Sequence, residues 1–300
     1  MKLKIIIASV LILSACCYQA GAQQIFTTSE YIQNNFLYNP AAAGAGDNPS
    51  IGMTYRKQWA GIDGGPQTYI AYGDKYFAAK KVGVGVSLYS DKTGPTSQTG
   101  GQADFSYSVI LKDSSQRLMF GFGGMLLQYG INKSELVLSN PGDPLLSAPG
   151  SEIKGDLAAG VYYKSSTLDV GFSAEQLVQA KLQFLKTTGN EQGELYRHYY
   201  FVADYNWRTD ADNVLVPNFI VQYLPNAPVD VQGGVVLQHD DVLWIGFNAH
   251  YQQGFEIDAG VKIDHKFSIG YAYEQFNTPV SSFDNGGASN ELSLRYFFIK

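Results

Sequence analysis

Apolar and polar residues alternate without a break in the stretch ADFSYSV, residues 103–109. Every odd position there is apolar or aromatic, and every even position is polar. Because successive side chains of a β-strand point to opposite faces, this stretch predicts a strand with one apolar face and one polar face. The same alternation recurs in LDVGFSA at 168–174, LWIGFNAHY at 243–251 and FSIGYAY at 267–273. The chain is therefore predicted to consist mainly of amphipathic strands.

Turn signals divide the chain into about fourteen such strands. Short polar or proline-containing turns are expected at 113–115, 164–166, 209–212, 225–228, 240–241, 252–254 and 264–265. Longer loops are expected at 91–99, 139–150 and 182–193. The strands are expected at 50–58, 66–77, 81–90, 100–112, 117–132, 151–164, 166–178, 195–207, 213–224, 228–239, 241–251, 254–263, 266–277 and 289–299. Tight turns on one side and longer loops on the other are typical of a transmembrane β-barrel, whose strands need about 9–11 residues each.

The composition distinguishes a membrane barrel from a soluble β-protein. Charged residues make up only 16% of the 300-residue chain, which contains 21 Tyr and 17 Phe. A soluble sandwich or lipocalin-like barrel would turn a charged face to water, but the polar positions here hold mostly Ser, Gly, Gln, Asn and Asp. The aromatic residues suit the girdles that a membrane barrel places at both interfaces. The net charge of −6 argues against a nucleic-acid partner, since phosphate binding needs a basic face.

The last stretch of the chain, ELSLRYFF at 291–298, also alternates and ends in aromatic residues. Such a terminal strand is what barrel-assembly machinery recognises in outer-membrane proteins. No stretch after the N-terminus approaches about 18 consecutive apolar residues, so no transmembrane helix is expected. We therefore predict an all-β, antiparallel up-and-down barrel over residues 50–300, integral to the outer membrane of a Gram-negative cell and in contact with its lipid.

The first 22 residues have the features of a signal peptide. Two lysines precede an apolar stretch, 5–13, that is too short to span a bilayer as a helix. The small residues AGA then predict cleavage between Ala22 and Gln23. Residues 23–49 lack clean alternation, so they are expected to form a periplasmic or luminal segment before the first strand.

A lipoprotein signal is the alternative, because LSAC at 13–16 has the pattern in which Cys16 becomes lipidated. Both cysteines, Cys16 and Cys17, lie in the predicted signal peptide. Cleavage before Gln23 would leave a mature chain without cysteine, and cysteine-based redox or metal chemistry would then be unavailable.

Catalytic groupings are not found in the sequence. None of the four histidines has metal-ligand spacing to another His or Cys, and no Gly-x-Ser-x-Gly motif is present. The histidines are His198, His239, His250 and His265. Glycines at 83–85 and 121–124 lie in predicted strands with no helix after them, so they are expected to relieve crowding or allow curvature in the wall. The sequence therefore predicts neither an enzyme nor a bound cofactor.

A minority of charged residues falls on the polar faces of the predicted strands, which line the lumen of a closed barrel. They are Asp104, Asp156, Asp169, Glu175, Asp204, Asp258, Glu291 and Arg295. They are interpreted either as solvated wall lining with internal ion pairs or as a selectivity surface. His250 shares a face with Asn248 and Gln252 and is expected to be luminal as well.

Three stretches in the first third of the chain resemble a known family. They are NNFLYNPAAAG at 34–44, YRKQWAGIDGGPQT at 55–68 and VGVGVSLYSDKTGPT at 82–96. In order and spacing they resemble the PorP/SprF family of Bacteroidetes outer-membrane proteins, which is tied to type IX secretion and gliding motility. The resemblance implies a barrel that anchors or helps translocate a cognate surface adhesin carrying a C-terminal sorting domain. It also implies contact with other components of the secretion system.

The motif residues can also be explained by structural roles, apart from contact with a partner. Asn39-Pro40 is expected to fix a turn, and the Ala and Gly residues after it allow close approach of backbones. Arg56 and Gln58 share one strand face, and Asp63 is expected either to pair with Arg56 or to cap the following turn. The candidates for partner contact are Asn39, Pro40, Tyr55, Arg56, Gln58, Trp59, Gly61, Asp63, Gly64, Pro66, Asp91, Gly94 and Pro95.

Three functional hypotheses follow. The first is the secretion-linked anchor or translocation component that the resemblance implies. The second is a passive outer-membrane channel for small solutes, because a closed barrel encloses a lumen. The third is a soluble β-protein held to the membrane by a lipid on Cys16.

Overall fold

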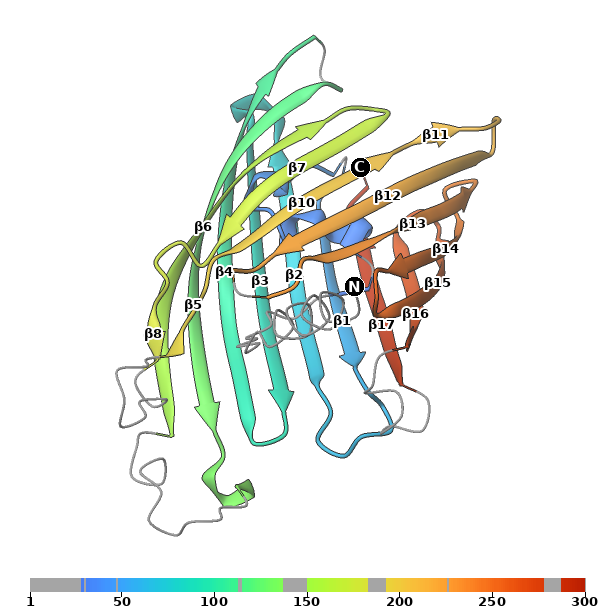
Figure 1. The fold of residues 1–300 in the computed structure, drawn as a ribbon. Helices are drawn as coiled ribbons and strands as arrows, with labels where there is room; N and C mark the ends of the chain where they lie inside the picture. Colours follow the sequence, from blue (N-terminus) through green and yellow to red (C-terminus); the bar gives the residue numbers. More distant parts are fainter. Residues whose placement is uncertain are drawn as a thin grey trace, which may run out of the picture.

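The computed structural model describes residues 28–29, 31–46, 48–112, 115–136, 150–182, 193–225, 227–277 and 287–299. Fourteen antiparallel strands close into a barrel, each paired with the wall strands before and after it (Figure 1). They are β1 (Ser50–Lys57), β2 (Gln67–Phe77), β3 (Val82–Thr93), β4 (Thr96–Ile110), β5 (Arg117–Ile131), β6 (Ser151–Lys164), β7 (Leu168–Glu175), β10 (His198–Tyr205), β12 (Asn213–Tyr223), β13 (Asp230–His239), β14 (Leu243–His250), β15 (Gly254–Ile263), β16 (Phe267–Phe276) and β17 (Ala288–Phe297). The first and last strands close the ring in unbroken register, from Ser50↔Phe297 to Lys57↔Asn290.

Three two-residue strands supplement the wall. β8 (Lys181–Leu182) pairs with β9 (Gly193–Glu194), and β11 (Trp207–Arg208) pairs with β12. β10 continues the ring because it pairs with both β7 and β12. In the part of the chain that the structure describes, no helix is long and apolar enough to cross a bilayer.

The predicted fold class is confirmed, and most strand boundaries lie within three residues of the predicted ones. The predicted loop at 91–99 is wrong. β3 continues to Thr93 and β4 already begins at Thr96, and a tight turn at Gly94-Pro95 joins them. Gly94 has a φ of 53°. Both faces of this end of the hairpin are polar, so the alternation on which the prediction depended fades before the strands end. The predicted loops at 139–150 and 182–193 fall mostly outside the described residues, as do positions 113–114.

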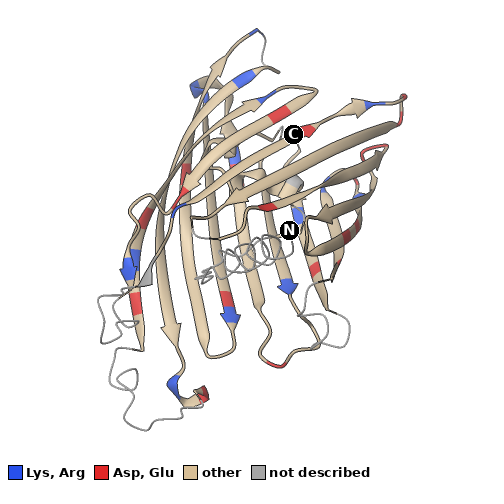
Figure 2. Cartoon of the chain, in the orientation of Figure 1, with Lys and Arg blue, Asp and Glu red and all other residues tan. Residues whose placement is uncertain are grey.

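The two faces of the wall have the polarity of a membrane barrel. Outward side chains are large and apolar, and Phe122, Leu126 and Ile153 are each more than 60% exposed. Inward positions hold buried polar groups, including Ser106, Ser108 and most of the predicted luminal carboxylates. Figure 2 shows long stretches of strand without any charged residue. In a bilayer this arrangement turns apolar surface to the acyl chains while the closed sheet pairs its own backbone groups.

The two rims of the barrel differ in their connections. One rim carries both ends of the wall, Ser50 and Phe297, and short turns at 78–81, 111–116, 165–167, 206–212, 240–242 and 264–266. The opposite rim carries the longer connections at 58–66, 132–150, 176–197 and 277–287, together with short ones at 94–95, 224–229 and 251–253. Because bacterial barrels have short periplasmic turns and longer outer loops, we name these the periplasmic rim and the outer rim.

Residues 28–46, the luminal segment, lie inside the barrel (Figure 1, dark blue). The segment contains two 3-10 helices, η1 (Tyr31–Leu37) and η2 (Pro40–Ala42). η2 packs against β3, β4, β5, β6 and β7. The sequence left open whether the part before the wall is periplasmic or luminal, and its described part is luminal. The predicted signal peptide, its cleavage between Ala22 and Gln23 and the alternative lipid site at Cys16 lie outside the described residues.

Candidate functional site

The luminal segment rests on inward glycines of the wall, which we call the glycine seat: Gly83, Gly121, Gly160 and Gly171. A Cβ at Gly83 would lie 1.9 Å from the Ala43 carbonyl oxygen, and one at Gly121 would lie 2.3 Å from the Ala41 nitrogen. Both distances are far below a van der Waals contact, so these positions accept the segment only without side chains. Of the glycines predicted to relieve crowding, Gly83 and Gly121 do so against residues of the luminal segment, whereas a Cβ at Gly124 would meet no atom within 4 Å.

Asn39 fastens the segment to the wall. Its side-chain nitrogen donates to the carbonyl oxygens of Val161 at 3.1 Å and Phe172 at 3.3 Å, on β6 and β7. Its side-chain oxygen accepts from Ala41 N at 2.9 Å and so caps η2, in which Pro40 takes the first position. Proline is favoured there because its missing N–H would have no partner. The predicted turn at Asn39-Pro40 is therefore the start of a short helix.

Further bonds tie the segment to the wall around its circumference. Wall side chains donate to its backbone carbonyls, from Ser173 Oγ to Tyr38 at 2.5 Å and from Ser106 Oγ to Ala43 at 2.7 Å. On the opposite wall, the Tyr31 hydroxyl donates to Asn218 Oδ1 at 2.5 Å. Burial raises the pKa of the Tyr31 phenol above its ordinary value, so the hydroxyl stays protonated as this bond requires.

Arg56 lies at the centre of a buried ion cluster. Its guanidinium reaches Glu274 Oε2 at 2.5 Å and Glu291 Oε2 at 3.3 Å, and it also donates to Ser29 Oγ. Glu291 is the direct register partner of Arg56 on β17. The predicted pairing with Asp63 is wrong, because Asp63 is exposed in the outer loop while Arg56 points into the lumen.

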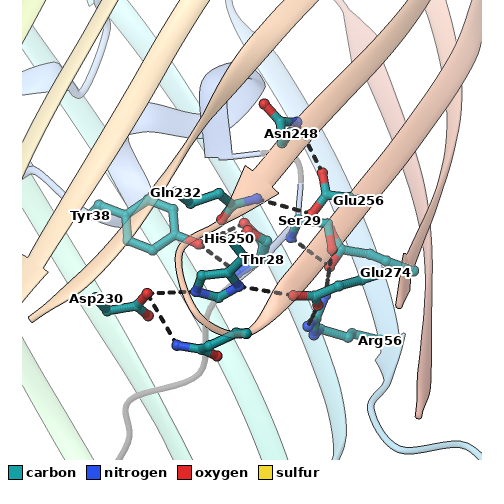
Figure 3. A network of polar contacts seen from close by, with 12 residues as sticks. Thr28, Ser29, Tyr38, Arg56, Asp230, Gln232, Asn248, His250, Glu256 and Glu274 are labelled. Carbon is teal, nitrogen blue, oxygen red and sulfur yellow. Dashed lines mark hydrogen bonds and ion pairs between the residues drawn. The ribbon is translucent and has the colours of Figure 1, made fainter. Parts of the chain in front are cut away.

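His250 extends this cluster across the lumen face (Figure 3). Its Nε2 lies 2.5 Å from Asp230 Oδ1, and its Nδ1 lies 3.0 Å from Glu274 Oε1. Two ionised carboxylates both need a donor, so the doubly protonated ring satisfies this geometry. Ser29 N donates to Glu291 Oε2 at 2.8 Å, which joins the start of the luminal segment to the same cluster.

Cavities lie on both sides of the luminal segment. The outer vestibule, of about 320 Å³, is lined by Gln58, Gln222, Asp230 and His250 among others and lies at the outer rim. A cavity of about 180 Å³ near the periplasmic rim is bordered by Ser29 and Arg295. Between them, Thr28, Tyr31 and Tyr38 approach β12 to β14 and line a small cavity of about 20 Å³.

The structure brings the three sequence motifs together. Thr68 Oγ1 of the second motif donates to Asp91 Oδ1 of the third at 2.6 Å. Gly94 N donates to the Gly64 carbonyl oxygen at 2.8 Å, so the β3–β4 turn contacts the 58–66 loop. The first motif meets the third where Ala43 contacts Gly83.

The remaining candidates lie on or near the outer rim. The Tyr55 ring packs on Tyr69 at 4.8 Å, and Gln58 N donates to the Pro66 carbonyl oxygen at 2.9 Å. Trp59 begins the outer loop with a φ of 52°, and its indole nitrogen is buried without a hydrogen-bond partner among the described residues. Gly61 is exposed in the same loop.

Sequence reasoning missed the ion cluster. Asp230, His250, Glu274 and Arg56 come from strands that are distant along the chain, and the search for a histidine partner considered only nearby positions. The available signal was the phase of the alternation, which places all four on inward faces. Across the ranges that the structure describes, no group of three or more His, Cys, Asp and Glu side chains is arranged to hold a metal ion.

A closed, fourteen-stranded wall with apolar outer and polar inner faces defines an integral outer-membrane β-barrel, here with a segment of its own chain in the lumen. The chain belongs to the PorP/SprF family of type IX secretion system membrane proteins, whose model matches residues 20–296. No curated protein sequence matches the chain.

Two solved structures share the fold at low sequence identity. The CymD monoaromatic hydrocarbon channel matches with a TM-score of 0.53 and 9% identity, over 93% of this chain and 96% of that one. A Pseudomonas aeruginosa FadL homologue matches with a TM-score of 0.53 and 11% identity, over 87% of this chain and 93% of that one. At these identities the likeness shows the barrel fold alone.

Proposed function

We propose that this barrel anchors or helps translocate a cognate surface adhesin with a C-terminal sorting domain, as a component of the type IX secretion system. Membership of the PorP/SprF family supports the system. The observation that carries the anchoring role is the luminal segment, which is bonded to strands on opposite sides of the wall and seated on its glycines. A barrel built around its own chain is suited to holding a partner at its rim.

The candidate contact surface is the outer-rim meeting of the second and third motifs. Gly61, Asp63 and Gly64 are exposed there, and the Gly94-Pro95 turn is bonded to the same loop. Asn39, Pro40 and Arg56 act from inside the lumen, where they hold the scaffold of this surface. The motif residues thus divide into an internal set and a rim set.

Deleting the gene and measuring surface display of the cognate adhesin tests the proposal. Display is expected to fall in the deletion strain and to return on complementation. Unchanged display without the barrel would contradict the anchoring role. Co-purification of the adhesin and other secretion components with the barrel from the outer membrane tests the same partnership by contact.

A charge-reversal variant locates the surface. Asp63→Arg places a cation on the exposed outer loop without touching the buried cluster, so the amount of co-purified adhesin is expected to fall. Ala227→Arg, on the outer-rim turn at 224–229, is the matched control. If both variants lose the same amount of co-purified adhesin, or if Asp63→Arg loses none, the outer loop is not the contact surface. The anchoring function is then decided by the deletion experiment alone.

The alternative of a passive solute channel is not favoured by the lumen. A channel needs a continuous aqueous path, whereas the luminal segment is packed against the wall between the two cavities, with a cavity of only about 20 Å³ beside Tyr31 and Tyr38. A steady open pore in planar bilayers would support the channel instead.

A further inference from the structure

An apolar groove of about 570 Å³ crosses the membrane-facing side of β3, β4, β5 and β6. Its lining includes Leu88, Gly101, Ala103, Gly124, Leu126 and Leu157. The leucines are each more than half exposed on the outer surface of the wall. The groove is therefore open to the hydrocarbon of the membrane and separate from the lumen.

The register of the strands creates the groove. Gly101 lies opposite Leu126, and Leu126 lies opposite Gly155 on the next strand. Gly124, in the adjacent row, lies between Ala103 and Leu157. Glycines, which have no side chain, thus alternate with outward-pointing leucines on neighbouring strands. A Cβ placed at Gly124 would meet no atom within 4 Å, so the floor of the groove is open at this point.

One side of the groove is formed by a turn. The β6–β7 ladder begins only at Ala159↔Ala174, and beyond it the turn after β7 continues the wall. Leu177 N donates to the Leu157 carbonyl oxygen at 3.0 Å, and Val178 N donates to Asp156 Oδ1 at 2.9 Å. These bonds hold the exposed Val178 side chain at the edge of the groove.

The surroundings of the groove change polarity along the strands. Toward the periplasmic rim the outward residue of β5 is Phe122, which is 69% exposed. Toward the outer rim, Ser90, Thr99 and Gln128 are exposed on the outward face, and the Ser90 and Thr99 hydroxyls lie 3.4 Å apart. An amphiphile with its chain in the groove would therefore have its polar end beside hydroxyl and amide groups near the outer rim.

We propose that this groove binds one acyl chain of an outer-leaflet lipid and retains that lipid on the barrel. The volume lies within the range of about 300–1,000 Å³ that small-molecule sites in proteins occupy. Within hydrocarbon there is no hydrophobic drive for a chain to leave other lipids, so shape and dispersion contacts determine which surface holds it longest. A shallow groove of this kind contacts more of the surface of a chain than a convex wall does.

Photolabelling in lipid vesicles tests the site. The full-length barrel is reconstituted into phosphatidylcholine vesicles containing a trace of phosphatidylcholine with a diazirine in the middle of its palmitoyl chain. After illumination, labelled peptides are located by mass spectrometry. Labelling is expected to concentrate on β4, β5 and β6 around Gly101 and Gly124.

Two leucine variants provide the decisive comparison. Gly124→Leu places a side chain in the groove, where its Cβ meets no atom within 4 Å. Labelling of β4 to β6 is therefore expected to fall by about threefold, which corresponds to a loss of less than about 1 kcal/mol in binding free energy. Ala259→Leu places the same leucine side chain on the outward face of β15, on another part of the wall, and leaves labelling unchanged.

Heat-dependent mobility on gels verifies that both variants are folded. Label spread evenly around the wall, or no change in Gly124→Leu, would overturn the proposal. Recovery of phospholipid and lipid A by native mass spectrometry of barrel purified from the outer membrane then identifies the source of the chain, and a retained inner-leaflet phospholipid alone would contradict the outer-leaflet assignment.

Discussion

A buried asparagine side chain has two donor and two acceptor positions, and Asn39 uses three of them inside the barrel. Only 1% of the residue is exposed, so water cannot replace a lost partner. The carbonyl oxygens of Val161 and Phe172 already take part in the wall, and Asn39 adds a bond between the luminal segment and two strands at once. At the scale of single residues, this side chain connects the interior to the wall.

Asn39→Ala is expected to lower the free energy of unfolding by about 2 kcal/mol, from a lost cap and buried groups left without partners. Denaturant unfolding of the barrel in lipid vesicles measures the change. The control is Asn132→Ala, which removes an exposed cap from η4 (Lys133–Glu135) and is expected to cost about 1 kcal/mol or less. Equal effects in the two variants would show that burial of Asn39 is unimportant.

Arg56 tests the contribution of buried charge. Arg56→Met removes the cation that Glu274 and Glu291 share and leaves His250 as the remaining partner of Glu274, so the variant is expected to cost about 3–5 kcal/mol of stability. The exposed pair Lys92–Glu135, at 3.4 Å, offers the comparison, because Lys92→Met should cost less than about 1 kcal/mol. The same unfolding measurement is used for both variants. A small decrease in the free energy of unfolding of Arg56→Met would mean that water or bound protons compensate the charges of Glu274 and Glu291.

At the scale of elements, β3 and β5 support η2 and its flanking residues through inward glycines. Gly83→Ala places a methyl group against the Ala43 carbonyl oxygen, and the luminal segment is expected to leave its seat. Hydrogen exchange of residues 31–46, read by mass spectrometry, should rise by about tenfold or more, as a destabilisation of about 1.4 kcal/mol predicts.

Gly124→Ala is the matched control for the seat, since its methyl group points outward and meets no atom within 4 Å. Exchange of the luminal segment should be unchanged in this variant. Faster exchange in both variants would point to a general weakening of β-structure by the substitution and not to a lost seat.

At the scale of the whole molecule, the lumen is divided by residues of the same chain. Deleting residues 28–46 removes the constriction between the outer vestibule and the periplasmic cavity, and single-channel conductance in planar bilayers is expected to appear. The intact barrel should conduct little under the same voltage. An intact barrel that conducts as well as the deletion variant would contradict the division.

The wall could be predicted from the sequence because alternation is a local property. The strands around 103–109 and 243–251 show their phase within a few residues, and the turns between strands are marked by proline, glycine and paired aspartates. The prediction of a loop at 91–99 was wrong for the same reason, because a strand end with two polar faces shows no alternation of apolar and polar residues. Pairing with Arg56 was one of two roles expected for Asp63, and it is not observed because Arg56 pairs in the lumen with Glu274 and Glu291, which are distant along the chain.

The sequence by itself determined the strand number, the inward and outward faces and the family motifs of this protein. Only the tertiary structure decided what occupies the lumen and which charges meet there. Tyr31 bonds to Asn218, and Arg56 to Glu291, across 187 and 235 residues of sequence. The physical reason is that the contact of Arg56 with Glu291 depends on the register at which β1 meets β17, and the contact of Tyr31 with Asn218 depends on the wall enclosing the luminal segment; both exist only when the barrel has closed.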